Sequence, residues 1–239
     1  MLTDPSFRDL LQRGSPVLSA WCGLPEPSVP GLLAREAFDA VTLDMQHGVI
    51  DFAAAMRAVP LIAAAGKPAL VRIPVGDFAS ASRFLDAGVS GVIAPMINTI
   101  EDARRLAAFT KVPPVGERSW GPQGALALSG LQPAAYFQRA NELTVTFAMV
   151  ETREALDIID DILAVPGIDG VFIGPSDLSI ALSGGRELNP AGAEVEEALD
   201  HALSRASELA RKGFHFISIA GDTAMLRAGA QAALAAARA

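Results

Sequence analysis

Cysteine is almost absent from this chain, since Cys22 is the only one among 239 residues. An internal disulfide is therefore excluded. The N-terminal segment carries Asp4 and Asp9, where a secretory signal would have a basic start followed by an apolar stretch. These two features lead us to expect a cytoplasmic protein.

Positive charge is also scarce. The chain has 19 lysine and arginine residues against 27 aspartate and glutamate residues, a formal net charge of −8, and no basic stripe. Nucleic acids and anionic membranes are therefore poor candidates as partners. The longest window without charge, residues 119–138, is interrupted by Pro122, Gly124, Gly130 and Pro133, so it cannot form a membrane helix.

Apolar residues, by contrast, make up 51% of the sequence, which is ample for a large core. Short apolar runs alternate with helix-like stretches, and no linker interrupts them, so we expect one domain over residues 1–239. Eight runs are predicted to be strands. They are residues 17–22, 40–43, 69–73, 91–96, 115–117, 144–150, 170–173 and 214–219.

Helices are predicted between these strands. Asp51, Asp77, Thr99 and Thr152 stand where helix N-caps belong, and a long helix is expected over residues 194–211. Buried parallel strands joined by helices favour an α/β fold of the (β/α)8 TIM barrel type. A doubly wound open sheet is the alternative, and it fits less well because no glycine fingerprint follows the first strand.

Polar residues follow the predicted strands where a barrel places its active site, at the carboxyl ends. Asp44 and His47 follow the second strand, Arg72 ends the third, Glu151 follows the sixth and Asp177 follows the seventh. Each has a purely structural alternative, such as a helix cap or a core ion pair. Their common placement nevertheless favours one site.

The chemistry of these side chains is mutually consistent. Glu151 and Asp177 suit a divalent cation that prefers oxygen ligands, such as Mg²⁺ or Mn²⁺. Arg72 supplies a second positive charge, and His47 beside Asp44 is a candidate general base. A metal, an arginine and a base together indicate enolate chemistry, and the turn at Gly174 can hold a carboxylate.

Lysine occurs only at positions 67, 111 and 212, each before a strand and so at the opposite end of a barrel. Catalysis through a lysine imine is therefore disfavoured. We expect His201 and His215 to be structural, and we assign Cys22 no role.

Six segments carry a resemblance to a known family. They read FDAVTLDMQHG, LVRIP, DAGVSGVIAPMINTIEDA, PPVGERSWGP, VETREAL and IDGVFIGPSDLS. The chain resembles the class II, metal-dependent pyruvate aldolases of the 4-hydroxy-2-oxoheptanedioate and 2-keto-3-deoxy sugar acid aldolase family. The resemblance implies reversible aldol cleavage and addition between pyruvate enolate and an aldehyde, with Mg²⁺, Mn²⁺ or Co²⁺ as the metal.

The resemblance also implies roles for individual residues. Glu151 and Asp177 are the expected metal ligands, and Arg72 binds the pyruvate oxygen and stabilises its enolate. His47, held by Asp44, is the expected acid/base by way of a metal-bound water. Three further residues are expected to bind substrate: Trp21 in the pocket wall, with a core role as the alternative, and Gly174 and Ser176 in the turn that holds the pyruvate carboxylate.

Two positions depart from the family pattern. Gln46 replaces a glutamate that many members have, and Ser176 replaces an alanine. Gln46 lies on the expected acceptor side of the substrate pocket, so its change bears on the identity of the aldehyde. Members with a glutamine before the histidine also occur, so activity is expected.

The alanine-rich segment 223–239 is predicted to be a helix that needs cover on more than one side. It is either an ordinary outer helix of the barrel or a helix packed into a neighbouring subunit. The resemblance implies the second, a homohexamer whose paired subunits exchange this helix. Two other functions stay open on the same site: decarboxylation of oxaloacetate, and binding of an oxo acid without catalysis.

Overall fold

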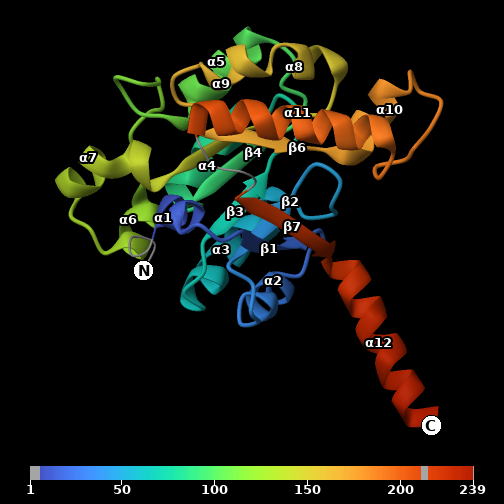
Figure 1. Ribbon diagram of the computed structural model, residues 1–239. Helices are drawn as coiled ribbons and strands as arrows, with labels where there is room; N and C mark the ends of the chain where they lie inside the picture. The colour runs from blue at the N-terminus through green and yellow to red at the C-terminus, as the bar shows by residue number, and fades with distance from the viewer. Residues whose placement is uncertain (1–5, 211–214, 239) are drawn as a thin grey trace.

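The computed structural model describes residues 6–210 and 215–238. A curled sheet of parallel strands forms its centre, with helices on the outside (Figure 1). The strands run in the order β6-β5-β4-β3-β2-β1-β7. Their bounds are β1 Val17–Cys22, β2 Ala40–Asp44, β3 Ala69–Arg72, β4 Gly91–Ala94, β5 Val145–Val150, β6 Gly170–Ile173 and β7 Phe216–Gly221.

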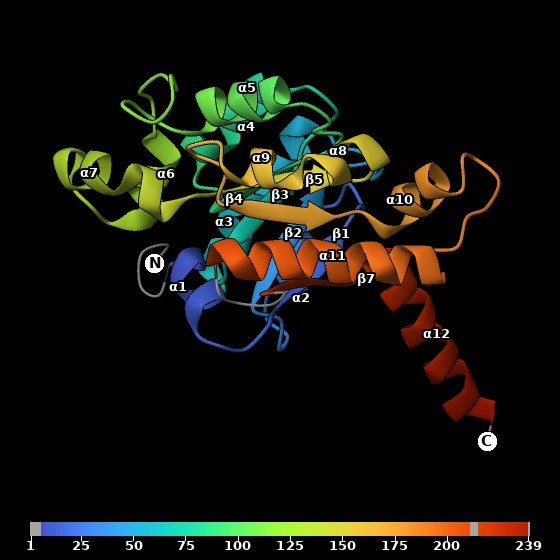
Figure 2. The same ribbon diagram turned by 45° about the horizontal axis from the view of Figure 1, so that its top comes forward.

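Helices connect successive strands and pack around the sheet, whereas α12 follows the last strand and extends away from the sheet, as Figure 2 shows from a second direction. Their bounds are α1 Phe7–Gln12, α2 Ser28–Leu33, α3 Phe52–Ala64, α4 Phe78–Ala87, α5 Ile100–Thr110, α6 Gln123–Ser129, α7 Pro133–Leu143, α8 Arg153–Asp157, α9 Ile159–Leu163, α10 Pro175–Leu182, α11 Ala193–Ala210 and α12 Asp222–Arg238. Among the described residues, none of the helices combines the length and the apolar character that a membrane crossing requires.

The predicted helix caps are confirmed. Asp51, Asp77, Thr99 and Thr152 each accept a hydrogen bond from the backbone N–H three residues later, which satisfies a donor that the helix itself cannot. The stretch after Thr152 is not one helix, however, because the backbone departs from helical angles at Ile158 and separates α8 from α9.

The predicted strand at residues 115–117 is wrong. Pro113 and Pro114 precede it and have no N–H for a ladder, and the following backbone folds back onto the end of α5. There the N–H of Gly116 donates to the carbonyl of Val112, and the N–H of Arg118 donates to that of Lys111. β4 consequently pairs directly with β5.

The described residues therefore form seven strands rather than the eight expected of a closed barrel. β6 and β7 are the two edges of the sheet, and no pairing joins them in the described part of the chain. The last strand was predicted over residues 214–219. The structure has it at Phe216–Gly221, and residue 214 lies outside the described residues.

The core lies on both faces of the sheet. Every residue of β2, β3, β4 and β5 is buried. The outer face packs against the helices, and the concave face holds a smaller cluster that includes Phe7, Phe147 and Met149. Burial on both faces explains why these strands read as continuous apolar runs.

A charged network lies at the amino ends of β5 and β6. The ammonium group of Lys111, whose side chain is almost fully buried, donates to Asp169 Oδ2 at 2.5 Å and to the carbonyl of Thr144 at 2.9 Å. Arg8 donates to the other oxygen of Asp169 at 2.6 Å. Lys111 is thus placed opposite the carboxyl ends, as predicted. Lys212 lies outside the described residues.

Candidate active site

Asp44 and Arg72 form a buried ion pair at the carboxyl ends of β2 and β3. The sheet register places them directly opposite each other. Arg72 Nε donates to Asp44 Oδ1 at 2.9 Å and Nη2 donates to Oδ2 at 2.6 Å. Two parallel bonds of this kind fix the plane of the guanidinium group as well as its position.

Trp21, near the end of β1, completes the support of this pair. Its indole Nε1 donates to Asp44 Oδ2 at 3.1 Å, and the Arg72 guanidinium lies over its ring, 4.9 Å from the centroid. Phe172 of β6 stacks on the Trp21 ring, with the two ring centroids 5.8 Å apart. Trp21 lines the cavity and also packs against the concave-face cluster, while its contact with substrate stays a prediction.

Asp44 is held as a carboxylate. Burial raises the pKa of Asp44, but the hydrogen bonds and charge of Arg72, with further hydrogen bonds from Trp21 and from the His47 backbone, outweigh it and leave the pKa below its usual value. The negative charge on Asp44 is therefore maintained at neutral pH.

His47 lies in the turn after β2, and its exposed side chain lines the cavity. Asp44 Oδ1 accepts hydrogen bonds from the backbone N–H groups of Gln46 and His47, at 3.0 and 3.3 Å. Among the described residues, the hydrogen bonds of Asp44 do not include the His47 imidazole. Asp44 thus shapes the turn that carries His47, while an aspartate–imidazole pair stays a prediction.

Gln46 stands apart from the other predicted site residues. It is not among the described residues that line the cavity, and its side-chain Oε1 is buried without a hydrogen-bond partner in the described part of the chain. Contact between Gln46 and an acceptor stays a prediction as well.

Glu151 directly follows β5, and its side chain is completely buried. One carboxylate oxygen, Oε2, accepts a hydrogen bond from the backbone N–H of Met96 at 3.0 Å. The other, Oε1, has no partner among the described residues. Burial raises the pKa of Glu151, and the adjacent Asp177 raises it further. The Met96 N–H and the Arg72 charge lower this pKa, but they offset the rise only in part.

Asp177 lies beside Glu151, on the helix that follows the neighbouring strand β6. β6 ends at Ile173, Gly174 precedes α10, and Asp177 lies in the first turn of that helix. No side chain caps this helix. Ser176 is exposed at the start of α10. Gly174, Ser176 and Asp177 all line the cavity at the carboxyl edge of the sheet.

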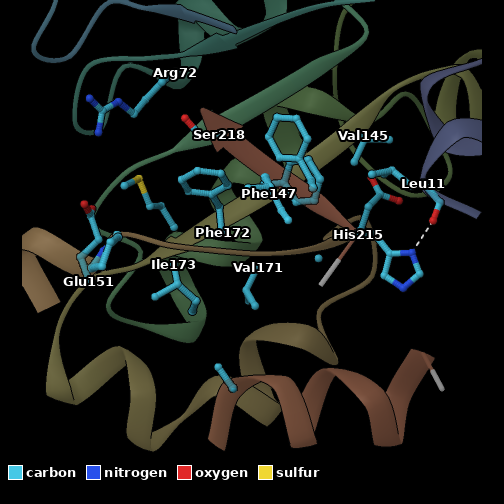
Figure 3. A pocket seen from close by; sticks show the side chains of 18 of the residues that line it. Leu11, Arg72, Val145, Phe147, Glu151, Val171, Phe172, Ile173, His215 and Ser218 are labelled. Atoms are coloured by element: carbon cyan, nitrogen blue, oxygen red, sulfur yellow. Dashed lines mark hydrogen bonds between the residues drawn. The ribbon is translucent and has the colours of Figure 1, made fainter. Parts of the chain in front are cut away.

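One cavity of about 930 Å³ is lined by most of the predicted site residues, namely Trp21, His47, Arg72, Glu151, Gly174, Ser176 and Asp177. Arg72 and Glu151 lie at one end, as Figure 3 shows, and Leu11 and His215 lie at the other. His215 Nδ1 contacts the Leu11 carbonyl there, a structural role as predicted. No group of three or more potential metal-ligating side chains occurs among residues 6–210 and 215–238, so Glu151 and Asp177 stand as a pair.

Residues 19–236 match the HpcH/HpaI aldolase/citrate lyase family. The chain belongs to this family. Its curled parallel sheet is also that of a solved relative, an HpcH/HpaI aldolase from Desulfitobacterium hafniense DCB-2. That structure has a TM-score of 0.86 and 25% sequence identity, with 97% of this chain and 96% of the other covered.

Two curated relatives show what members of the HpcH/HpaI family do. A hydroxypyruvate/pyruvate aldolase from Rhizorhabdus wittichii is 39% identical, over 97% of this chain and 98% of its own length. A 4-hydroxy-2-oxo-heptane-1,7-dioate aldolase from Salmonella dublin is 32% identical, over 95% and 92%. Both relatives are named as aldolases.

Two features of this HpcH/HpaI site have no signal in the sequence. Met96 adopts a left-handed backbone conformation, with φ of 56°, which residues other than glycine rarely do. This conformation accompanies the N–H that it donates to Glu151. Asp222 is buried and accepts hydrogen bonds from the N–H groups of Gly23 and Leu24, at 3.0 and 2.9 Å. It thereby ties the loop after β1 to the start of α12.

Proposed function

We propose that this protein is a carbon–carbon lyase that catalyses reversible aldol addition of pyruvate to an aldehyde. In the forward direction the pyruvate methyl carbon loses a proton, and the resulting enolate carbon bonds to the aldehyde carbon. The new alkoxide then gains a proton. Cleavage reverses these steps. Membership of the aldolase family and the names of the two curated relatives support this proposal.

One observation carries the proposal: Arg72 and Glu151 line the same end of one cavity. Arg72 uses Nε and Nη2 to bind Asp44, so Nη1 is the nitrogen left for a substrate oxygen. A guanidinium group fixed in this way stabilises the negative charge that develops on the pyruvate ketone oxygen, without reorganising during the reaction.

The Glu151 and Asp177 carboxylates fit a divalent cation. Glu151 Oε1 is buried without a partner in the described chain, and hard cations such as Mg²⁺, Mn²⁺ or Co²⁺ accept such oxygens. A cation held by Glu151 and Asp177 would supply Lewis acidity toward the substrate. Its positive charge also neutralises the pair of acidic side chains.

The remaining predicted residues receive the other parts of the substrate. His47 is the proposed acid/base for the proton of the pyruvate methyl carbon, a contribution of about 10²–10⁴ in rate. Trp21 walls the cavity beside Arg72. The N–H of Gly174 already donates to the carbonyl of Val150 at 3.2 Å, and Pro175 has no N–H. The backbone N–H of Ser176 is therefore the donor that we propose for the pyruvate carboxylate.

Proton NMR of the pyruvate methyl group in D₂O tests this function without requiring the natural aldehyde. We expect the signal to disappear when Mg²⁺ or Mn²⁺ is present and to persist with a chelator. His47→Ala should slow the exchange strongly and bind the metal as before, whereas the control His201→Ala, on α11, should exchange normally.

Other outcomes separate the two alternatives. Pyruvate binding without exchange under any of the metals would indicate an oxo-acid-binding protein. Release of CO₂ from oxaloacetate much faster than cleavage of any hydroxy-oxo acid would make decarboxylation the main reaction, since both reactions pass through the enolate of pyruvate.

The proposal also covers the oligomeric state, through the exposed helix α12. Almost all of α12 is exposed, including Leu226 and Leu234, and it projects away from the sheet in Figure 1. We expect it to pack into a neighbouring subunit, closing the barrel within a cytoplasmic homohexamer. Light scattering tests this, because the double variant Leu226→Asp with Leu234→Asp should dissociate the assembly, whereas Arg227→Asp should affect it less.

A further inference from the structure

Asp222 is a buried carboxylate at the carboxyl end of β7 that the proposed reaction does not use. β7 ends at Gly221, which lines the cavity. Asp222 begins α12, at the point where that helix leaves the sheet (Figure 1). Only 3% of Asp222 is exposed. Asp222 therefore follows its strand at the same edge of the sheet where Asp44 and Glu151 lie.

In the described part of the chain, the hydrogen bonds of Asp222 all come from backbone N–H groups. Its Oδ2 atom accepts from Gly23 at 3.0 Å and from Leu24 at 2.9 Å, and its Oδ1 atom accepts from Thr223 at 2.8 Å. A buried carboxylate is unfavourable unless hydrogen bonds satisfy it, and N–H bonds to a charged oxygen are stronger than those to a neutral one. These bonds therefore fix the loop after β1 firmly.

The loop after β1 packs in turn against the turn that carries His47. The carbonyl of Gly23 accepts a hydrogen bond from the N–H of Val49 at 2.8 Å. The two segments also meet backbone to backbone, since a Cβ atom on Gly48 would lie only 2.7 Å from Gly23 Cα. Gly23 therefore contacts Asp222 through its N–H and the His47 turn through its carbonyl.

The His47 turn is consequently held at both of its ends. At its start, Asp44 Oδ1 accepts hydrogen bonds from the N–H groups of Gln46 and His47. At its end, Val49 donates to the carbonyl of Gly23. The first attachment depends on the Asp44 carboxylate, and the second depends on a loop that the Asp222 carboxylate fixes.

From these contacts we propose that Asp222 is a positioning residue for His47: through Gly23, its carboxylate fixes the turn that places the imidazole in the cavity. This inference rests on the proposed function, in which His47 is the acid/base. Asp222 is not among the described residues that line the cavity, so it acts through the turn rather than on the substrate. Loss of Asp222 should misplace the imidazole and leave Arg72 and the proposed metal ligands in position, because those residues follow other strands.

Pyruvate methyl exchange in Asp222→Ala tests this positioning. The rate at saturating pyruvate should fall by about tenfold to a hundredfold, the loss that a small misplacement can cause. The pyruvate concentration at half-maximal rate and the Mn²⁺ affinity should stay the same. Asp222→Asn keeps an oxygen acceptor for the two N–H groups and should recover much of the rate.

The matched control is Asp39→Ala. Asp39 also accepts a backbone N–H from β1, that of Leu18 at 2.9 Å, but it lies before β2, at the amino end of the sheet. This variant should exchange the methyl protons at the normal rate per folded molecule.

A second substitution shows whether Asp222 acts through His47. In a His47→Ala protein, Asp222→Ala should lower methyl exchange no further, because the side chain that Asp222 positions is gone. A general loss of folded or assembled protein would instead add to the loss from His47→Ala. Additive losses, or full methyl exchange in Asp222→Ala alone, would overturn the proposal.

Backbone hydrogen–deuterium exchange gives a readout that needs no activity. In Asp222→Ala the N–H of Val49 should lose protection, whereas the N–H of Ile73, which donates to the Ile93 carbonyl at 3.1 Å, should stay protected. Unchanged protection of Val49 would overturn the proposal, whatever the activity. If Val49 loses protection but the unmodified protein never exchanges the pyruvate methyl protons, the aldolase function fails and the link from Asp222 to the His47 turn stands.

Discussion

Arg72 and Asp44 face each other across neighbouring strands and share two hydrogen bonds, at 2.9 and 2.6 Å. The pair is buried, and Trp21 contacts both members. This arrangement fixes the direction of the guanidinium group before any substrate binds, and it makes Arg72 different from a cation that merely supplies charge.

We therefore expect Arg72→Lys to lower the rate of pyruvate methyl exchange by about a hundredfold or more, the usual loss when one preorganised donor is removed. Lysine keeps the charge but cannot form the paired bonds to Asp44. The matched control is Arg57→Lys, at an exposed position of α3. An exchange rate within a few-fold of the unmodified protein would show that charge alone suffices.

Glu151→Gln should have opposite effects on metal binding and on stability. Gln keeps the shape of the side chain but removes a buried charge beside Asp177, where burial and that neighbour already raise the pKa of Glu151. The metal-free variant should therefore have a Tm equal to or above that of the unmodified protein. Titration calorimetry with Mn²⁺ should show affinity reduced at least tenfold, whereas Glu154→Gln, on α8, should bind normally.

Asp44→Asn should change the acid dependence of stability. Because the pKa of Asp44 lies below the usual 3.8 in the folded protein, its ionisation stabilises the fold above that pH, and this contribution is lost as the pH falls below it. Urea unfolding from neutral pH downward should show a deficit for Asp44→Asn that narrows below about pH 3.8. A deficit that is constant with pH would indicate lost packing instead.

Lys111→Met should destabilise the fold without affecting the site. Removing one partner of a buried ion pair costs about 3–5 kcal/mol, and Lys111 also donates to two backbone carbonyls. Urea unfolding measures the loss, with Lys67→Met as the milder control. Methyl exchange per folded molecule should stay the same, because Lys111 does not line the cavity. A large drop in exchange would contradict this separation.

Apolar runs were sufficient to locate most of the strands. The predicted strands over residues 40–43 and 69–73 agree with β2 and β3, respectively, to within one residue, because strands buried on both faces leave a continuous apolar signal. The predicted strand at 115–117 had a weaker apolar signal, since it contains a glycine and a glutamate. The two preceding prolines and the backbone hydrogen bonds to the end of α5 outweighed that signal. The edges at β6 and β7 follow from tertiary pairing, which no local pattern reports.

Strand ends were equally informative for the site. Arg72 and Glu151 were expected together because parallel strands present their carboxyl ends on one side, and both line the cavity. The positive φ of Met96 and the burial of Asp222 could not be expected, since neither residue type signals them. The partners of Asp44 also could not be read from spacing, because Arg72 is 28 positions away.

Gly174 has no functional group, yet its position sets a limit on the metal ligand. A Cβ atom there would lie 2.6 Å from Glu151 Oε1 and 2.7 Å from Met149 Cε, closer than atoms can approach. Any side chain at position 174 would therefore displace the carboxylate at 151, so a residue without a side chain fixes where a carboxylate 23 positions earlier in the chain can lie.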